Sequence, residues 1–262
     1  MMKVVNQKIS IVSIPLKRTV IADIFLPHDF DPTRSYPLLI LNDGQDAEQL
    51  DLKTIVHDLW NLNLCKPFIA VAPHTTNRLH EYGVTNIVDF KGRGSLAGEY
   101  SQFVTDELIP FTRNHLRTKE FVSISIAGFS LGGLSAFDIA WNNPGIFDAV
   151  AACSGSFWWR QKDLDEGYTD DDRIMHKVVR NTHSKPSLSI TLTCGSLDEK
   201  ADRNNNGIID SVDDTMDLKH ELEKKGFIAG NDLTFNLVIG GRHTQETYGI
   251  MLADFMKQNY PK

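Results

Sequence analysis

Apolar and polar positions along this chain follow two different periods, which alternate from one end of the chain to the other. Strict alternation and short apolar runs are typical of strands, and they occupy residues 8–14, 18–26, 37–41, 68–71, 121–127, 147–153, 187–194 and 233–239. Apolar positions three and four apart predict helices over residues 48–61, 95–116, 131–141, 173–179, 216–225 and 245–258. Pro110 is expected to kink or end the second of these helices.

Strands and helices that alternate in this way predict an α/β fold. We expect a mostly parallel central sheet with helices on both faces, and antiparallel edge strands formed by the N-terminal residues. No repeat, low-complexity tract or Pro/Gly/Ser-rich linker divides the chain. Residues 1–262 are therefore interpreted as a single domain, and a core of this size needs no disulfide or metal in order to fold.

Charge and composition narrow the range of partners. The 262 residues carry a formal net charge of −7 at pH 7, which argues against nucleic acid or an anionic membrane surface as the main partner. No stretch approaches the roughly 18 consecutive apolar residues of a membrane span, and the N-terminal segment does not resemble a signal peptide. Cys65, Cys153 and Cys194 are interpreted as free thiols rather than as a disulfide framework. The expected compartment is the cytoplasm.

The turn between the fifth predicted strand and the following helix contains a G-x-S-x-G pattern, residues 128–132, with Ser130 at its centre. The pattern alone occurs by chance in about one chain in ten of this length, but a strand-to-helix turn is where a nucleophile elbow lies. In such a turn the serine hydroxyl projects above the sheet, and the helix N-terminus beneath it offers N–H groups to an oxyanion. Ser130 is therefore the candidate nucleophile. The alternative is a capping serine in a glycine-rich turn.

A serine nucleophile needs a general base, and the base needs a carboxylate to orient it. His183, His220 and His243 are the histidines that lie far enough beyond the elbow. His243 is the candidate base because it follows the last predicted strand through a Gly-Gly turn, and loops at the carboxyl ends of strands gather a site. Asp198, the first carboxylate after the preceding strand, is the candidate acid, with Glu199 as the alternative.

The tetrahedral intermediate of such a reaction needs two convergent backbone N–H donors. One is expected from Leu131, directly after the nucleophile, and the other from the loop that follows the third predicted strand, with the Gln45 amide as the best candidate. Taken alone, that loop reads as an ordinary Asp-Gly turn.

With these residues in place, the chain resembles the putative-esterase family of α/β-hydrolases, which includes esterase D, feruloyl esterases and ferric enterobactin esterases. The resemblance extends from about Pro37 to the C-terminus and rests on the segments LLILNDGQD, NRLHEYG, IAGFSLGGLSAFDIAW, SGSFWW and GGRH. It implies an α/β-hydrolase fold and serine ester hydrolysis, and it matches Ser130 to the nucleophile and His243 to the base. Arg242 departs from the family pattern, in which the glycine pair directly precedes the histidine. The position of the acid varies in the enterobactin esterase branch.

Aromatic and basic residues near the expected site are candidate substrate contacts. Trp158 and Trp159 follow a strand end, where they would form an aromatic wall for a bulky or aromatic group; packing under the next loop is the alternative. Arg78 or Arg160 is a candidate for holding an anionic substrate group, against the alternative of a solvated surface arginine.

Residues 202–213 carry a second motif, because they fit the twelve-residue calcium-binding loop. Side-chain oxygens fall at positions 1, 3, 5, 9 and 12, a backbone carbonyl would supply position 7, and the corresponding residues are Asp202, Asn204, Asn206, Asp210, Asp213 and, through its carbonyl, Ile208. Position 12 is Asp where an EF-hand has Glu, and a strand precedes the loop, so a structural role is expected rather than a sensor role. We expect a structural Ca²⁺ and no cofactor for catalysis.

The sequence therefore favours a serine carboxylic ester hydrolase that acts on a small-molecule ester through an acyl-enzyme. Aryl or siderophore-type esters are expected ahead of esters bound to polysaccharides. Two alternatives stay open, a non-catalytic α/β-hydrolase-fold protein used for binding or regulation, and an acyltransferase.

Overall fold

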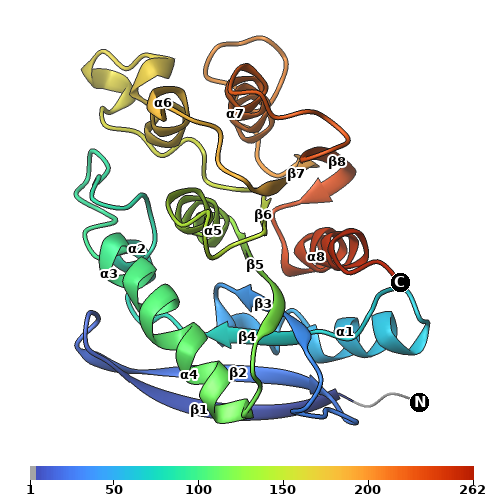
Figure 1. Cartoon of the computed structure of the whole chain (residues 1–262). Coiled ribbons are helices and arrows are strands. Elements are labelled where there is room, and N and C mark those ends of the chain that lie inside the picture. Colours follow the sequence, from blue (N-terminus) through green and yellow to red (C-terminus); the bar gives the residue numbers. More distant parts are fainter. Residues whose placement is uncertain (1–3) are drawn as a thin grey trace.

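The computed structural model describes residues 4–262 and contains one eight-stranded sheet with helices on both of its faces (Figure 1). Along the sheet the strands follow the order β1-β2-β4-β3-β5-β6-β7-β8. Their bounds are β1 (Val4–Ser13), β2 (Arg18–Pro27), β3 (Tyr36–Leu41), β4 (Ile69–Pro73), β5 (Phe121–Phe129), β6 (Ala149–Cys153), β7 (Ser189–Leu197) and β8 (Leu233–Arg242).

The direction of the strands confirms the predicted fold class. β1 pairs with β2, and β2 with β4, in antiparallel fashion, whereas all pairings from β4 through β3 and β5 to β8 are parallel. The parallel strands are strongly apolar because helices cover both of their faces. β1 and β2 form the antiparallel edge expected from the alternation of their sequence.

The helices fall into two groups, each packed on one face of the sheet. One face is covered by α1 (Leu52–Asn61) and α8 (Gln245–Asn259), whose buried side chains join a single core cluster. The helices that bury side chains against the opposite face are α3 (Ala97–Gln102), α4 (Ile109–Leu116), α5 (Leu131–Asn142), α6 (Ile174–Asn181) and α7 (Asp210–Lys224). A further short helix, α2 (Arg78–Glu81), follows β4.

Two helices differ from their predicted bounds for identifiable reasons. A π-helical segment, Phe103–Leu108, joins α3 to α4, so the chain is helical on both sides of Pro110 and the helix does not end there. α7 begins at Asp210 rather than at residue 216 because the end of the 202–213 loop is already helical.

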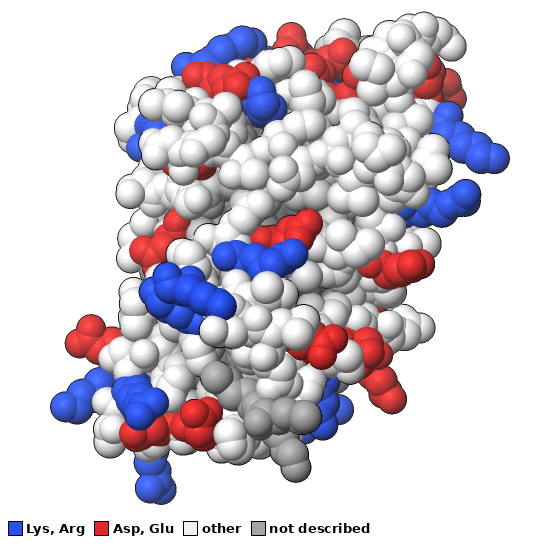
Figure 2. All heavy atoms as spheres, turned by 90° about the vertical axis from the view of Figure 1, so that its right-hand side faces the viewer, with Lys and Arg blue, Asp and Glu red and all other residues white. Residues whose placement is uncertain are grey.

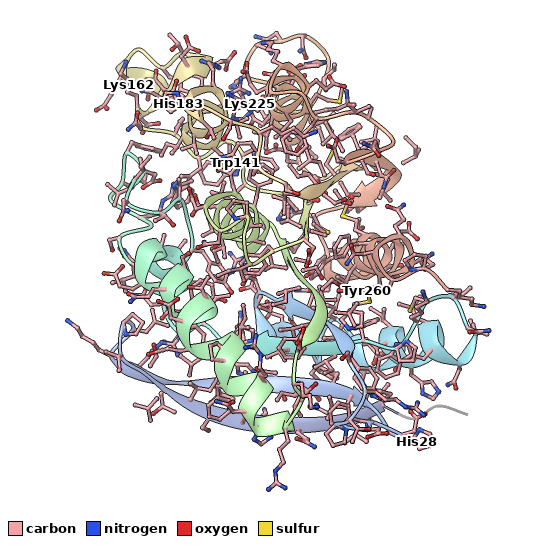
Figure 3. All side chains as sticks on the ribbon, viewed as in Figure 1. His28, Trp141, Lys162, His183, Lys225 and Tyr260 are labelled. Atoms are coloured by element: carbon pink, nitrogen blue, oxygen red, sulfur yellow. The ribbon has the colours of Figure 1, made fainter. Side chains whose placement is uncertain are left out.

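Side chains that join the layers are mostly apolar and fully buried. At the end of α5, Trp141 lies toward α6 and donates from its indole N–H to Thr182 Oγ1 at 3.0 Å (Figure 3). On the other face, Tyr260 stacks on Phe68 with ring centroids 4.6 Å apart. All three cysteines are free and buried, as the sequence predicted.

The surface is mixed in charge. Figure 2 shows lysines and arginines interspersed with acidic residues on the face turned to the viewer. Within residues 4–262, no helix combines the length and apolar character needed to cross a membrane.

Candidate active site

The carboxyl ends of the parallel strands meet along one edge of the sheet, and the residues predicted for catalysis follow four of these ends. Ser130 follows β5, Asp198 follows β7, His243 follows β8, and the loop with Gln45 follows β3. The parallel register brings these ends together although the residues are far apart in sequence.

Ser130 occupies a strained turn between β5 and α5. Its backbone has φ 58° and ψ −124°, outside the regions that non-glycine residues ordinarily adopt. The turn is possible because the neighbouring glycines lack side chains: a Cβ on Gly128 would lie 2.1 Å from the carbonyl oxygen of Gly132. The Ser130 carbonyl accepts bonds from the Gly133 and Leu134 amides, which starts α5 directly after it. This is the geometry of a nucleophile elbow.

His243 lines the same pocket as Ser130, and Asp198 lies beside His243. His243 Nδ1 is 3.9 Å from Asp198 Oδ1, and the His243 ring lies against the Phe129 ring at a centroid distance of 4.4 Å. Asp198 is buried; its Oδ2 accepts the Gly195 amide at 3.0 Å, whereas Oδ1 has no donor within the described chain. The separation of 3.9 Å is longer than a hydrogen bond, so the pair is adjacent but not bonded.

Glu199, the alternative acid, points elsewhere. Its Oε1 accepts the Ser211 amide at 2.6 Å, in the first turn of α7. The neighbouring strand end therefore turns Asp198 toward the histidine and Glu199 toward the helix. Of the two other late histidines, His183 lies beside the end of α6 (Figure 3) and His220 lies within α7.

Arg242, the residue that departs from the family pattern, continues β8 instead of displacing His243 from the site. It pairs with Leu197 across a register shift, and its amide donates to Thr247 Oγ1 at 3.0 Å. Burial lowers the pKa of the His243 imidazole below 6.5, Asp198 acts in the opposite direction, and Arg78 adds to the lowering. His243 is therefore neutral, and able to accept a proton, at pH 7.

The loop after β3 is held tightly against the elbow. Asp43 has φ 63°, and its amide donates to the Tyr82 hydroxyl at 2.8 Å. Asn42 Nδ2 donates to the Gly132 carbonyl at 2.8 Å, and a Cβ on Gly132 would lie 2.5 Å from the Asp43 carboxylate. The loop is thus fixed to the first turn of α5, on the side where an oxyanion would form.

The predicted oxyanion donors are placed at the starts of two helices. Leu131 opens α5, and Gln45 is the second residue of a short 3₁₀-helix, Gly44–Asp46, so neither amide has an intrahelical acceptor. Gly44 lines the pocket beside Ser130, whereas Gln45 lines a neighbouring pocket and sends its side chain to Thr75 and Asp43. The roles of Leu131 and Gln45 as oxyanion donors stay predictions.

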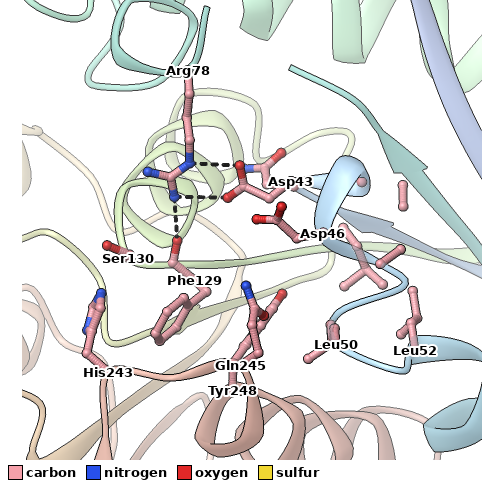
Figure 4. Close-up of a pocket in the computed structure, with 15 residues that line it drawn as sticks. Asp43, Asp46, Leu50, Leu52, Arg78, Phe129, Ser130, His243, Gln245 and Tyr248 are labelled. Carbon is pink, nitrogen blue, oxygen red and sulfur yellow. Dashed lines mark hydrogen bonds and ion pairs between the residues drawn. The ribbon is translucent and has the colours of Figure 1, made fainter. Parts of the chain in front are cut away.

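Arg78 is engaged by the protein itself. Its guanidinium donates to both carboxylate oxygens of Asp43 at 2.8 and 3.0 Å and to the Phe129 carbonyl at 3.3 Å (Figure 4). The ring of Tyr82 lies 5.5 Å from the guanidinium carbon. Arg78 therefore ties the loop after β3 to the residue that precedes the nucleophile, and Asp43 already neutralises the charge that was expected to hold a substrate anion.

A pocket of about 220 Å³ opens beside Ser130. Its walls are polar on the side of the elbow and apolar at the far end, where Leu50 and Leu52 lie (Figure 4). Sequence reasoning missed several of its polar residues, although they are close in sequence to residues that it named; they are Asp43, Asp46, Gln245 and Tyr248. It also missed Ser156, whose Oγ lies 3.5 Å from Ser130 Oγ.

The two tryptophans are not walls of this pocket. Trp159 is fully buried in the core, where its ring lies under the Arg93 guanidinium at 4.8 Å and against Gly83 and Gly94. Trp158 is partly buried and lines a separate pocket of about 180 Å³ together with Arg160 and Glu199. The prediction that Trp159 forms a substrate wall is corrected, since Trp159 lies in the core and lines neither of these two pockets; the alternative of packing is the one that the structure shows.

The 202–213 loop has the backbone of a calcium-binding loop. The Asp202 carboxylate accepts the amides of Asn206 and Gly207 at 3.1 and 2.9 Å, and Gly207, at position 6, has φ 87°. The side chains of Asn204 and Asn206 both contact Asp213 Oδ2, at 3.0 and 2.7 Å. Side chains from positions 3, 5 and 12 of the loop therefore converge.

Position 9 of the loop does not join this convergence. Asp210 instead accepts the Arg203 amide at 2.8 Å and lies 3.3 Å from its guanidinium. Within residues 4–262, no three His, Cys, Asp or Glu side chains gather as a metal site; the convergence depends on two asparagines. Both asparagines present Nδ2 to Asp213, while their Oδ1 atoms accept the amides of Asn206 and Ile208 at 3.1 and 2.8 Å. Their amide groups would have to turn over to offer oxygen, the ligand that Ca²⁺ prefers.

Comparison with known proteins agrees with this architecture. A sequence relative, the uncharacterized protein YbbA of Bacillus subtilis (strain 168), is 22% identical over 142 residues, which is 52% of this chain and 56% of the relative. The chain thus matches little more than half of that relative's length. Among solved structures, a ferulic acid esterase superposes with a TM-score of 0.73 at 17% identity, covering 98% of both chains. Enterochelin esterase from Shigella flexneri superposes with a TM-score of 0.74 at 20% identity, over 97% of this chain and 57% of that one.

These structural likenesses, at low identity, establish the fold. The family is established by sequence, because residues 13–257 match the model of one family, described as Putative esterase. That match includes the elbow, the loop after β3 and the histidine after β8. The chain belongs to the Putative esterase family.

Proposed function

We propose that this protein hydrolyses carboxylic esters through a triad of Ser130, His243 and Asp198. The observation that carries the proposal is the strained backbone of Ser130, which places its hydroxyl at the mouth of the pocket that His243 also lines. The buried Asp198 Oδ1 supports the choice of acid. It lacks a donor, His243 Nδ1 is 3.9 Å away, and a buried carboxylate oxygen without a donor is costly.

In the proposed reaction, Ser130 Oγ attacks the ester carbonyl while His243 accepts the hydroxyl proton. The Leu131 and Gln45 amides stabilise the oxyanion, and His243 then donates the proton to the departing alcohol. Water, deprotonated by His243, hydrolyses the acyl-enzyme, and Ser130 is regenerated. The short approach of His243 to Asp198 that this requires is made when the imidazole becomes cationic, because a charge-assisted hydrogen bond is stronger and shorter.

For the substrate we propose small aryl or siderophore-type esters. Two of the structural neighbours, a ferulic acid esterase and an enterochelin esterase, support this choice of substrate. A pocket of about 220 Å³ is smaller than the usual ligand pocket of about 300–1,000 Å³. The pocket therefore holds one arm of such an ester, and the other arm would lie outside it.

We also propose that the 202–213 loop binds a structural Ca²⁺ through Asp202, Asn204, Asn206, Asp213 and the Ile208 carbonyl. The ion would stiffen the connection between β7, which carries Asp198, and α7. It would take no part in the chemistry.

The test of the catalytic proposal is hydrolysis of p-nitrophenyl acetate and butyrate by the wild type and by Ser130→Ala. We expect activity that is lost in the variant, and a fluorophosphonate adduct on Ser130 in the wild type. Absence of both the activity and the adduct would contradict the proposal in favour of a binding role. Transfer of the acyl group to an added alcohol faster than to water would identify an acyltransferase.

A further inference from the structure

The polar groups of the pocket beside Ser130 divide into those that the protein satisfies and those that it does not. Asn42 donates to the Gly132 carbonyl and accepts from the Tyr100 hydroxyl at 2.8 Å. Asp43 and Arg78 satisfy each other. These three residues need nothing from a ligand.

Three other groups in the same wall have no partner among residues 4–262. No described residue donates a hydrogen bond to the Asp46 carboxylate, and Gln245 Oε1 and the Tyr248 hydroxyl are buried without partners. Figure 4 shows these residues on both sides of one space, with Asp46 on the loop after β3 and the other two on α8. Two of the three groups are obligate acceptors in this state, a carboxylate and an amide oxygen. The space therefore matches a ligand that donates hydrogen bonds.

The charges around the pocket favour a cationic donor over a neutral or anionic one. Asp43 and Arg78 form an ion pair, and no described cation forms an ion pair with the Asp46 carboxylate, which therefore leaves this wall of the pocket acidic. Burial raises the pKa of the Asp46 carboxyl and the neighbouring Asp43 raises it further, whereas Arg78 and His74 act in the opposite direction without reversing the shift. A ligand cation would supply a counter-charge.

Size and position indicate which part of the ester enters. The volume of about 220 Å³ holds roughly seven water-sized groups, enough for a short chain. The pocket extends from Ser130 toward Leu41 and Ala72, which are buried at the sheet edge. A group held there stays in place while the alcohol leaves and water enters, which suits the acyl arm.

We infer that the pocket beside Ser130 accepts a short acyl group that ends in a primary ammonium group. The ammonium donates to the Asp46 carboxylate. Gln245 Oε1 and the Tyr248 hydroxyl, which lie beneath the wall of the pocket, accept from it when their side chains rotate. The inference rests on the proposed function, because it assigns the acyl arm of the ester that Ser130 would attack.

The test uses a pair of esters that differ only in charge. p-Nitrophenyl butanoate and p-nitrophenyl 3-aminopropanoate have acyl chains of the same length, and at pH 6.5 the second carries an ammonium where the first has a methyl. The ammonium also raises the chemical reactivity of the ester, so a direct comparison of the two esters is not enough. For each protein we therefore take kcat/KM for the aminopropanoate divided by kcat/KM for the butanoate. The informative quantity is this ratio in wild type divided by the same ratio in Asp46→Asn. We expect this quotient to be about ten or more.

Glu48→Gln is the matched control. It removes one negative charge two residues further along the same segment, and Glu48 lines the neighbouring pocket but not that of Ser130. This control should keep the wild-type ratio of the two esters. A quotient near one for Asp46→Asn, or the same quotient for Glu48→Gln, would overturn the inference while leaving the ester hydrolase intact.

A binding measurement separates failure of the inference from failure of the proposed function. If neither ester is hydrolysed faster than by Ser130→Ala, saturation-transfer NMR with n-propylammonium and with propionate still reports on the pocket. Binding of the amine, but not of the acid, to wild type and its loss in Asp46→Asn would support the ammonium site without esterase activity. Equal signals from both compounds would overturn it.

Discussion

At the scale of single residues, the site is defined by side chains whose hydrogen-bonding needs are incompletely met. Asp198 keeps one buried oxygen without a donor, 3.9 Å from an imidazole. Ser130 Oγ lies 3.5 Å from Ser156 Oγ, which is too long for a strong hydrogen bond that would fix the Ser130 hydroxyl in one orientation. Groups in this condition are ready to form stronger bonds when charge develops during a reaction.

Removing the charge of the proposed acid should therefore cost more than removing that of its neighbour. Asp198→Asn is expected to lower kcat by about 10³–10⁴-fold, because the imidazole loses the carboxylate that orients and stabilises it. Steady-state kinetics with p-nitrophenyl butyrate measures this. Glu199→Gln, whose carboxylate contacts the α7 amide of Ser211, should remain within a few-fold of wild type; the reverse order of effects would assign the acid to Glu199.

The pH dependence of activity should reflect the burial of His243. The reaction needs the neutral imidazole, and burial lowers its pKa below 6.5. Neutral base therefore persists to lower pH than in an exposed histidine, and the acid limb of kcat/KM is expected to have its midpoint below pH 6.5. A midpoint above pH 6.5 in a profile of kcat/KM against pH would show that the Asp198 charge outweighs desolvation.

At the scale of elements, the sequence predicted the strands and helices themselves more reliably than the junctions between them. Strands, helices and their order follow from periodicity, and so does the site of the elbow between β5 and α5. The start of α7 at Asp210 was missed because the 202–213 loop ends inside the helix. The pocket residue Asp46 was missed because its segment reads as a simple turn, and only the packing of that turn on α5 gives it a function.

The elbow itself should tolerate no added side chain. Gly128→Ala would place a Cβ 2.1 Å from the Gly132 carbonyl oxygen, so backbone must shift at the junction of β5 and α5. The expected loss in the free energy of unfolding is more than about 3 kcal/mol, measured by urea denaturation. Gly145→Ala, whose Cβ would meet nothing within 4 Å, is the control and should change stability by less than about 1 kcal/mol.

The 202–213 loop is expected to bind Ca²⁺, and the thermal stability of the protein reports this binding. Saturating Ca²⁺ is expected to raise the melting temperature by several degrees, because an ion bound only by the folded state stabilises it by about 2.7 kcal/mol at one hundred times its Kd. The shift should disappear in Asp213→Asn and persist in Asp165→Asn, an exposed aspartate outside the loop. An equal response to Ca²⁺ and chelator in wild type and Asp213→Asn would contradict a site in this loop.

At the scale of the whole molecule, the site depends on contacts between distant parts of the chain. Asp43, Arg78 and Phe129 come from the loop after β3, the start of α2 and the end of β5, and they meet at hydrogen-bond distance. The sequence placed these three segments at the same edge of the sheet, but it could not reveal that Arg78 pairs with Asp43. For the same reason the sequence left open whether Trp159 forms a wall of the substrate pocket or packs under the next loop, and Trp159 lies in the core. Pairing between side chains is a property of the folded chain, which periodicity does not encode.

Arg78 should accordingly affect catalysis by positioning the loop after β3. Arg78→Lys keeps the charge but loses the two-pronged contact with Asp43 and the bond to the Phe129 carbonyl. We expect kcat to fall about tenfold with a smaller change in KM, and added guanidinium to restore part of the activity of Arg78→Ala. Arg34→Lys, at an exposed position, is the control. A rise in KM without loss of kcat would instead indicate direct substrate contact.

The backbone of Ser130 has one further consequence, for the balance between durability and activity. At φ 58° and ψ −124° a glycine is at ease and a serine is not, at a cost on the order of 1–3 kcal/mol. If random variants of this protein were selected only for resistance to heat, Ser130→Gly would be among those favoured. Such a variant would be more stable but would lack the nucleophilic hydroxyl. A screen for stability in this protein must therefore select for catalytic turnover at the same time.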